Sequence, residues 1–220
     1  MSDRYPHTEE IEVHYPTTVM QRQFSDVGEL NESLFRLVKN LEQKYKGTEH
    51  DAVTTKTVST QGGFQTSTSM NLFMLEDEAV GTFRDELVLP AIRDYLKHVF
   101  GDESATLDPW PIGWSSVLHE GDWQGPHLHP SEKNVASAVY YVHLPEDMTN
   151  PEGHIEFINP HLASVHHGFS TTRRLEPVEG KLIVFPPYYM HYVHPFRGDG
   201  ERVIISFDVL AQKPGMQLVF

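Results

Sequence analysis

From residue 110 onward the chain is a series of short runs rich in β-branched and aromatic residues, separated by turn-forming residues. Short strands at even spacing, with turn signals between them, are typical of a β-sandwich or barrel. We therefore predict a mainly β fold with flanking helices, whose core is a double-stranded β-helix, or jelly roll. The runs are WPIGWSSVLH (110–119), VASAVYYVHL (135–144), GHIEFIN (153–159), GKLIVFPP (180–187), MHYVHPF (190–196) and RVIISFDVLA (202–211).

The first half of the chain has a different pattern. Apolar residues at helical spacing predict amphipathic helices over residues 27–47 and 79–101, with Pro90 marking a kink or boundary in the second. Residues 11–24 are extended in character, and residues 48–69 are polar and predict a loop with short strands. Two helices are too few to form a domain of their own, so we expect them to support the strands that follow.

Composition restricts the chemistry. The 220 residues include no cysteine, which excludes disulfides, thiolate metal sites and thiol nucleophiles. A net charge of -14 argues against binding to nucleic acid or to an anionic membrane. No apolar run approaches the roughly 20 residues of a membrane span, and the N-terminus lacks the pattern of a signal peptide, so the expected location is cytoplasmic. The 14 histidines are the compositional feature that suggests a site.

Two of these histidines lie in GPHLHP (125–130). Residues i and i+2 of a strand point to the same face, so His127 and His129 can bind one metal ion together. In MHYVHPF the same alternation turns His191 and His194 to opposite faces, and we expect His191 to point inward. The alternative is that all four are solvated histidines beside turns.

The run RVIISFDVLA has two distinct faces. Arg202, Ile204, Ser206 and Asp208 share one face, and the other face is wholly apolar and is expected to pack into the core. An arginine among β-branched residues is costly to bury unless it meets an anion, and its planar guanidinium suits a carboxylate. The alternative is a solvated polar face with Arg202 at its edge.

Taken in order, these motifs resemble the Fe(II)- and 2-oxoglutarate-dependent oxygenases. The similarity extends over about residues 110–210 and is strongest to uncharacterised members with a His-x-His-Pro motif. It is carried by GDWQGPHLHP, SAVYYVHLP, GHIEF, GKLIVFPPYYMHYVHPF and RVIISFDV. In that family two histidines and one carboxylate hold the iron on one face.

The resemblance implies that His127 and His191 are the two histidine ligands of the metal. His129 then stands where the family usually has a carboxylate, so a three-histidine site would keep the full +2 charge of the ion. This difference bears on redox properties and on the preference for iron over zinc, nickel or copper. Asp122, Glu132 and Glu156 are the other carboxylates that could supply a ligand.

The resemblance also assigns the co-substrate site. Arg202 matches the basic residue that binds the far carboxylate of 2-oxoglutarate, and Ser206 matches its hydroxyl partner. Tyr141 matches an aromatic donor to the same carboxylate, although a strand tyrosine that only packs in the core is an equal alternative.

The function implied is oxidative decarboxylation of 2-oxoglutarate with O₂, coupled to hydroxylation of a small-molecule or protein substrate. No catalytic residue is expected beyond the metal centre. We expect one domain over residues 1–220, with 1–105 as helical and extended support and 106–213 as the jelly-roll core with the metal site. Two alternatives remain: a cupin-type three-histidine dioxygenase that does not use 2-oxoglutarate, and a jelly-roll module that binds metal without catalysis.

Overall fold

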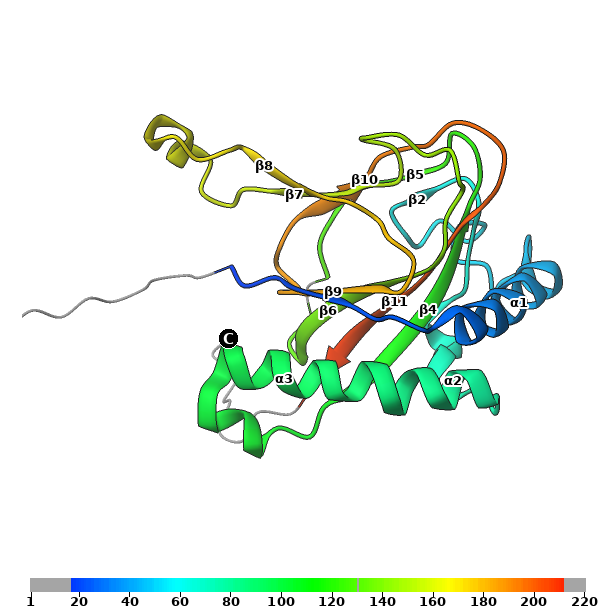
Figure 1. The fold of residues 1–220 in the computed structure, drawn as a ribbon, viewed down its shortest axis with the longest axis horizontal. Helices are drawn as coiled ribbons and strands as arrows, with labels where there is room; N and C mark the ends of the chain where they lie inside the picture. Colours follow the sequence, from blue (N-terminus) through cyan, green and yellow to red (C-terminus); the bar gives the residue numbers. More distant parts are fainter. Residues whose placement is uncertain (1–16, 130, 212–220) are drawn as a thin grey trace, which may run out of the picture.

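The computed structural model describes residues 17–129 and 131–211, and Pro130 and the predicted extended segment before residue 17 lie outside them. The chain forms two antiparallel sheets that face each other, with the helices covering the outer side of the larger sheet (Figure 1). The larger sheet has the order β1 (Met20–Gln23), β9 (Lys181–Phe185), β6 (Asn134–His143), β11 (Arg202–Leu210), β4 (Trp110–Leu118) and β3 (Phe64–Gln65). The smaller sheet has the order β2 (Thr60–Gln61), β5 (Trp123–His127), β10 (His191–Val193), β7 (Ile155–Ile158) and β8 (Thr172–Leu175).

The mainly β fold with flanking helices is as predicted, and its two facing sheets are those of a jelly roll. After residue 110, two strands lie outside the predicted runs. Strand β5 contains Gly125 and Pro126, which suggested a turn. Strand β8 is polar because it is an edge strand of the smaller sheet and carries exposed arginines.

Two predicted helical regions are present. Helix α1 (Gly28–Tyr45) is continuous, and the second region is divided into α2 (Glu78–Thr82), a π-helical turn (Phe83–Val88) and α3 (Leu89–Phe100). The division falls next to Pro90, which cannot donate a backbone hydrogen bond to the preceding turn. Short 3-10 helices lie at Thr68–Met70, Leu72–Met74, Gly101–Thr106 and Leu162–His167.

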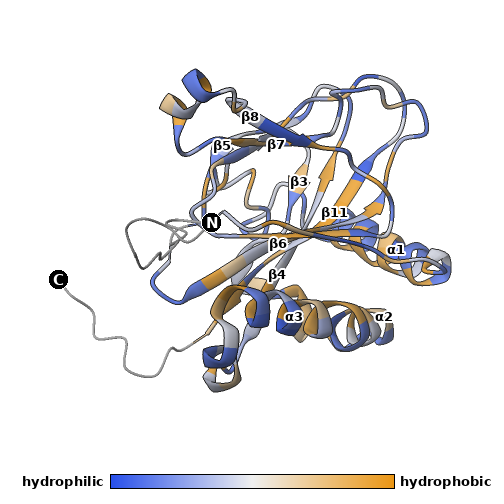
Figure 2. Cartoon of the chain, turned by 60° about the vertical axis from the view of Figure 1, so that its left-hand side comes forward, coloured by the Kyte–Doolittle hydropathy of each residue, from blue (hydrophilic) through white to orange (hydrophobic). Residues whose placement is uncertain are grey.

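Each face of the larger sheet buries a separate apolar cluster. The helices cover one face, where Val203, Ile205 and Phe207 of β11 pack with residues of α1 and α3. The other face meets the smaller sheet, where Ile204 packs with residues of β7 and β10. Figure 2 shows hydrophobic and hydrophilic segments side by side along α2 and α3, as expected for amphipathic helices that cover one face of a sheet. Among the described helices, none has the length and hydrophobicity needed to cross a bilayer.

A buried carboxylate ties α1 to the strands. Glu42 of α1 is 6% exposed and accepts hydrogen bonds from Lys39, from Lys46 (3.0 Å) and from the His119 ring (3.1 Å) just after β4. Lys39 also reaches Glu201, the residue before β11, at 2.5 Å. Burial alone would raise the pKa of Glu42, but these donors outweigh it and lower the pKa to about 2.

A carboxyl whose pKa is lower in the folded protein than in the unfolded chain stabilises the fold above its unfolded pKa, and this stabilisation is lost as the pH falls. For Glu42 the loss spans the range from 4.5 down to about 2 and amounts to at most about 3 kcal/mol. We therefore expect Glu42→Gln to lower the free energy of unfolding at pH 7 and to flatten its decline across this range. Urea denaturation at pH 7, 4 and 2.5 measures both effects.

Glu32→Gln is the matched control, because Glu32 pairs with Arg36 on the same helix but its side chain is 68% exposed. Glu32→Gln should leave the pH dependence of the free energy of unfolding almost unchanged. An acid-induced loss of stability in Glu42→Gln equal to that of the wild type would contradict the assignment.

Candidate functional site

Two of the predicted histidines face each other across neighbouring strands of the smaller sheet. His127 ends β5, His191 begins β10, and the two residues are paired directly in the antiparallel register. Paired residues on such strands project from the same face, so the two rings lie with their centroids 4.3 Å apart. Strand pairing therefore fixes this part of the site.

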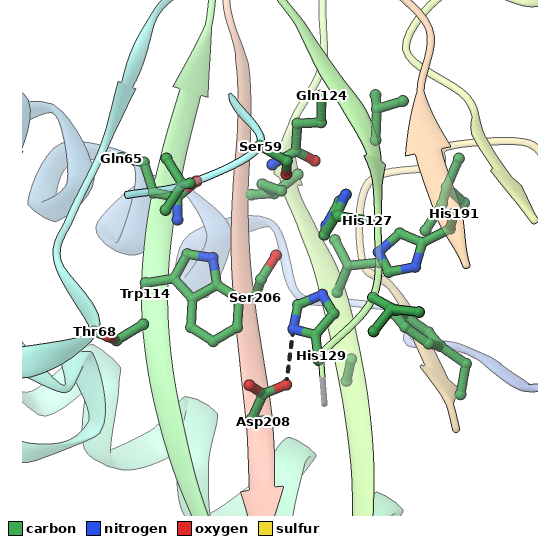
Figure 3. A pocket seen from close by; sticks show the side chains of 18 of the residues that line it. Ser59, Gln65, Thr68, Trp114, Gln124, His127, His129, His191, Ser206 and Asp208 are labelled. Atoms are coloured by element: carbon green, nitrogen blue, oxygen red, sulfur yellow. Dashed lines mark ion pairs between the residues drawn. The ribbon is translucent and has the colours of Figure 1, made fainter. Parts of the chain in front are cut away.

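His129 lies two residues beyond His127, just past the end of β5. Its backbone N–H donates to the carbonyl of Pro187 at 2.8 Å, and this bond holds it beside the loop that leads into β10. Its ring lies parallel to those of Trp114 and His191, at centroid distances of 5.7 and 5.3 Å. The structure thus brings together the three histidines predicted from the sequence, as Figure 3 shows.

Each of these imidazoles has an oxygen atom close to Nδ1. The carbonyls of Gly125 and Tyr189 are hydrogen-bonded to Nδ1 of His127 (2.7 Å) and of His191 (2.8 Å), and Oδ1 of Asp208 lies within ion-pair distance of Nδ1 of His129 (3.0 Å). A hydrogen on Nδ1 leaves Nε2 with a free lone pair, which is the usual arrangement of a metal-binding histidine. The three rings each offer one ligand atom, and these atoms lie within 4.8 Å of one another. The donor set therefore fits one divalent metal ion.

The buried position of the rings also favours metal binding. Burial, with neighbouring His129 adding to it, lowers the pKa of His127 to about 4. Burial and the nearby His127 ring hold the pKa of His191 well below its usual value of 6.5. Both imidazoles are therefore neutral at pH 7, and a metal ion does not have to displace a proton from them.

A cavity of about 460 Å³ opens in front of the histidines, between the two sheets. Arg202 and Ser206 line it from β11, and Val139, Ile155 and Phe185 form buried apolar walls. Residues 56–59, Gln65 of β3 and Thr68 also line the cavity. The carbonyl of Ser59 accepts a hydrogen bond from the backbone N–H of Gly125 in β5, so the 56–59 segment lies beside the smaller sheet.

Arg202 is fully buried, and its Nε and Nη1 atoms have no hydrogen-bond partner among the described residues. The ring of Tyr141 lies 5.3 Å from its guanidinium carbon, and the Tyr141 hydroxyl is also buried without a described partner. Gly153 leaves room for the arginine, because a Cβ there would lie 3.4 Å from Arg202 Cδ and 2.8 Å from Met148 Sδ. Donors that are buried and unsatisfied at a cavity indicate a site for an anionic ligand.

The other candidate ligands lie elsewhere. His194 points to the opposite face, as the alternation predicted, and bonds to Glu156 at 2.5 Å. Asp122 accepts a hydrogen bond from the backbone N–H of His119 at 2.9 Å, and Glu132 is exposed. None of these three carboxylates belongs to the histidine cluster.

Two residues near the histidines were not predicted as site residues from the sequence. Asp208 was placed on the same face of its strand as Arg202 but was given no role. Trp114, on the neighbouring strand β4, pairs with Ser206 and lines the cavity beside His129. Alternation along the two strands was the available signal, but the pairing of β4 with β11 was needed to place Trp114.

Comparison with known proteins identifies a family model that matches part of the chain. Residues 113–208, from within β4 to within β11, match the family model described as "Putative 2OG-Fe(II) oxygenase". Among curated proteins no sequence matches the chain significantly.

Solved structures share the fold at low sequence identity. A prolyl-4-hydroxylase of Pseudomonas putida aligns with a TM-score of 0.60 at 15% identity, over 87% of this chain and 91% of its own. HygX of Streptomyces hygroscopicus, solved with nickel and 2-oxoglutarate, aligns with a TM-score of 0.55 at 12% identity, over 88% and 82%. The viral collagen prolyl hydroxylase of Paramecium Bursaria Chlorella virus-1, solved with 2-oxoglutarate, gives a TM-score of 0.54 at 15% identity, over 87% and 94%.

The histidine cluster between the two sheets lies within the segment that matches the 2OG-Fe(II) oxygenase family model, residues 113–208. The solved structures show that the chain shares the fold of 2OG-Fe(II) oxygenases. The family resemblance, the fold class and the enzyme class predicted from the sequence are therefore confirmed. The assignment of individual site residues stays a prediction.

If the three histidines form one metal site, purified protein should bind about one divalent ion per chain. His127→Ala and His191→Ala should each abolish tight binding, because two remaining protein ligands are too few. Metal content after anaerobic purification, measured by elemental analysis, checks this.

His154→Ala is the matched control. This histidine is also buried and also bonds through Nδ1 to a backbone carbonyl, that of Glu152 at 2.8 Å, but it lies outside the cluster. It should retain the metal. Full occupancy in a protein lacking both His127 and His191 imidazoles would refute the site.

Proposed function

We propose that the chain is an Fe(II)- and 2-oxoglutarate-dependent dioxygenase that hydroxylates its substrate while converting 2-oxoglutarate to succinate. The observation that carries this proposal is Arg202, a fully buried cation at the cavity with two unsatisfied nitrogen atoms. The match of residues 113–208 to the 2OG-Fe(II) oxygenase family model supports it independently.

A buried and unpaired guanidinium is costly, and it persists in folded proteins where a ligand supplies the counter-charge. Burial lowers the pKa of Arg202, and the side chain that lies against it, Tyr141, is not an anion at neutral pH. A carboxylate offers two oxygens in the geometry that matches two guanidinium N–H groups. Arg202 therefore suits the carboxylate of a ligand that extends from the histidines along β11.

2-Oxoglutarate has the required form, since it carries a 2-oxo acid at one end and a carboxylate at the other. Nε2 of His127, His129 and His191 would hold Fe(II), which leaves positions on the metal for the 2-oxo acid and O₂. Arg202 would bind the far carboxylate, with the hydroxyls of Ser206 and Tyr141 as further donors.

Fe(II), when bound, supplies the activation of O₂ that the protein side chains cannot provide. In the overall reaction, one oxygen atom of O₂ enters the substrate as a hydroxyl group. The other enters succinate, and 2-oxoglutarate loses CO₂. The protein positions the reactants and excludes water, since the cavity walls next to the histidines are the buried side chains of Val139, Ile155 and Phe185.

The substrate is a small molecule or a peptide segment of a protein. Solved relatives of the same fold include a prolyl hydroxylase of Trichoplax adhaerens in complex with a hypoxia inducible factor peptide fragment and HygX with hygromycin B, so the fold accommodates both kinds of substrate. The acidic chain makes nucleic acid a poor substrate. We also propose a cytoplasmic location, on the sequence features given above.

The three-histidine ligand set favours a second candidate, a cupin-type dioxygenase that does not use 2-oxoglutarate. That candidate leaves the unsatisfied nitrogens of Arg202 unexplained. Succinate formation from 2-oxoglutarate under O₂, measured with pooled metabolites and peptides added, separates the two: release of succinate supports the main proposal, and its absence with metal-loaded protein favours the cupin-type enzyme.

Arg202→Ala should weaken 2-oxoglutarate binding at least about tenfold, because a charge-assisted contact of this kind contributes roughly 1.5–3 kcal/mol. Arg202→Lys should give an intermediate affinity, since it keeps the charge but loses the planar fork. Titration calorimetry of anaerobic, metal-loaded protein with 2-oxoglutarate measures these affinities.

Arg22→Ala serves as the control, because Arg22 pairs with Asp94 (2.8 Å) on the helix side of β1, away from the cavity. The affinity of the Arg22→Ala variant for 2-oxoglutarate should equal that of the wild type. Equal binding by Arg202→Ala and Arg22→Ala would remove the basis of the proposal.

The burial of Arg202 also leads to a prediction about thermal stability. Replacing a buried unpaired cation by an apolar side chain of similar length removes a desolvation cost, so Arg202→Met should have an unchanged or higher Tm without 2-oxoglutarate. Added 2-oxoglutarate should raise the Tm of the metal-loaded wild type but not that of the variant. Thermal unfolding with and without the co-substrate tests both statements, and a large drop in the Tm of ligand-free Arg202→Met would show a structural role instead.

A further inference from the structure

The carboxylate of Asp208 lies on the side of the His129 ring opposite to the free nitrogen. Its Oδ1 is 3.0 Å from His129 Nδ1, as the dashed line in Figure 3 shows. Both side chains are largely buried, with 24% of Asp208 and 13% of His129 exposed. The contact is therefore partly shielded from water, where an ion pair or charged hydrogen bond is stronger than at the surface.

Asp208 is fixed in this position by its neighbours on β6. It pairs with Ser137 across the strands, and the Ser137 hydroxyl donates to Asp208 Oδ1 at 2.7 Å. The Asn134 amide donates both to Ser137 Oγ and to the backbone carbonyl of His129, at 3.2 Å each. One network thus holds both the carboxylate and the backbone of the histidine that it contacts.

This arrangement distinguishes His129 from the other two histidines of the cluster. His127 and His191 bond through Nδ1 to neutral backbone carbonyls, whereas Nδ1 of His129 lies 3.0 Å from a carboxylate oxygen. In the sequence resemblance described above, His129 stands where non-haem iron oxygenases usually have a carboxylate ligand. Asp208 itself is not grouped with the metal-binding atoms of the three histidines, so it lies one imidazole away from the ion position.

We propose that Asp208 is a positioning residue that returns to the metal centre the negative charge lost by having histidine at position 129. The inference rests on the proposed function. The carboxylate orients the imidazole, keeps its hydrogen on Nδ1 and makes Nε2 a stronger donor, as carboxylate partners of metal-binding histidines do. The ion, the three neutral histidines and Asp208 together carry the net charge of +1 that two histidines and a carboxylate ligand would give.

Asp208→Asn tests the charge, because the amide has almost the same size and polarity as the carboxylate but carries no charge. Removing such a partner typically lowers metal affinity by about 10- to 100-fold, and we expect a loss in this range. Anaerobic titration with Co(II), followed by its visible absorption bands and by competition with a chelator, gives the affinity without relying on turnover. Glu179→Gln is the matched control, since it removes the carboxylate of another His–carboxylate pair, with His143 at 3.1 Å, away from the cavity.

A second pair of variants separates this role from a structural one. In His129→Asp the usual carboxylate ligand is restored, but it lies beside Asp208, and two neighbouring carboxylates repel each other. Adding Asp208→Asn to His129→Asp should therefore strengthen Co(II) binding, whereas the same change weakens it in the wild type. A merely structural role would change affinity in the same direction in both backgrounds.

The outcomes separate this inference from the proposed function. Opposite effects of Asp208→Asn in the two backgrounds, with Glu179→Gln unchanged, support the positioning role. Unchanged affinity in Asp208→Asn, or a loss of similar size in both backgrounds, overturns it while leaving the three-histidine site intact. A wild-type protein that binds no Co(II) would instead overturn the proposed function, and this inference with it.

Discussion

The two-sided character of β11 is the constraint on which the rest of the structure depends. Its apolar face binds the sheet to the helices through Val203, Ile205 and Phe207. Its other face carries Arg202, Ser206 and Asp208 into the cavity. A shift of one residue in the pairing of β11 would exchange the two faces, so the packing of the helical layer also fixes the register of the polar residues.

The smaller sheet contributes the complementary half of the site, and it does so through backbone geometry. The direct pairing of His127 with His191 places two imidazoles together through the backbone of the strands. Their Nδ1 acceptors are backbone carbonyls within two residues of each ring. This part of the site is therefore preorganised by the strands themselves, and only His129 depends on contacts from more distant segments.

Much of this arrangement could be predicted from the sequence because it follows local rules. Alternation along single strands identified the faces of His191 and Arg202, and helical spacing identified α1. The position of Asp208 next to His129 could not be predicted, because it depends on how β11 lies against a loop some 80 residues earlier in the chain. Strand β5 was obscured for a local reason, since Gly125 and Pro126 are turn formers that here lie within a paired strand.

The residues that line the cavity come from two parts of the chain. The predicted metal and co-substrate residues all lie within the segment that matches the family model, residues 113–208, whereas residues 56–59, Gln65 and Thr68 precede it. Substitutions within residues 56–68 can therefore change the shape of the cavity without altering any of the predicted metal and co-substrate residues.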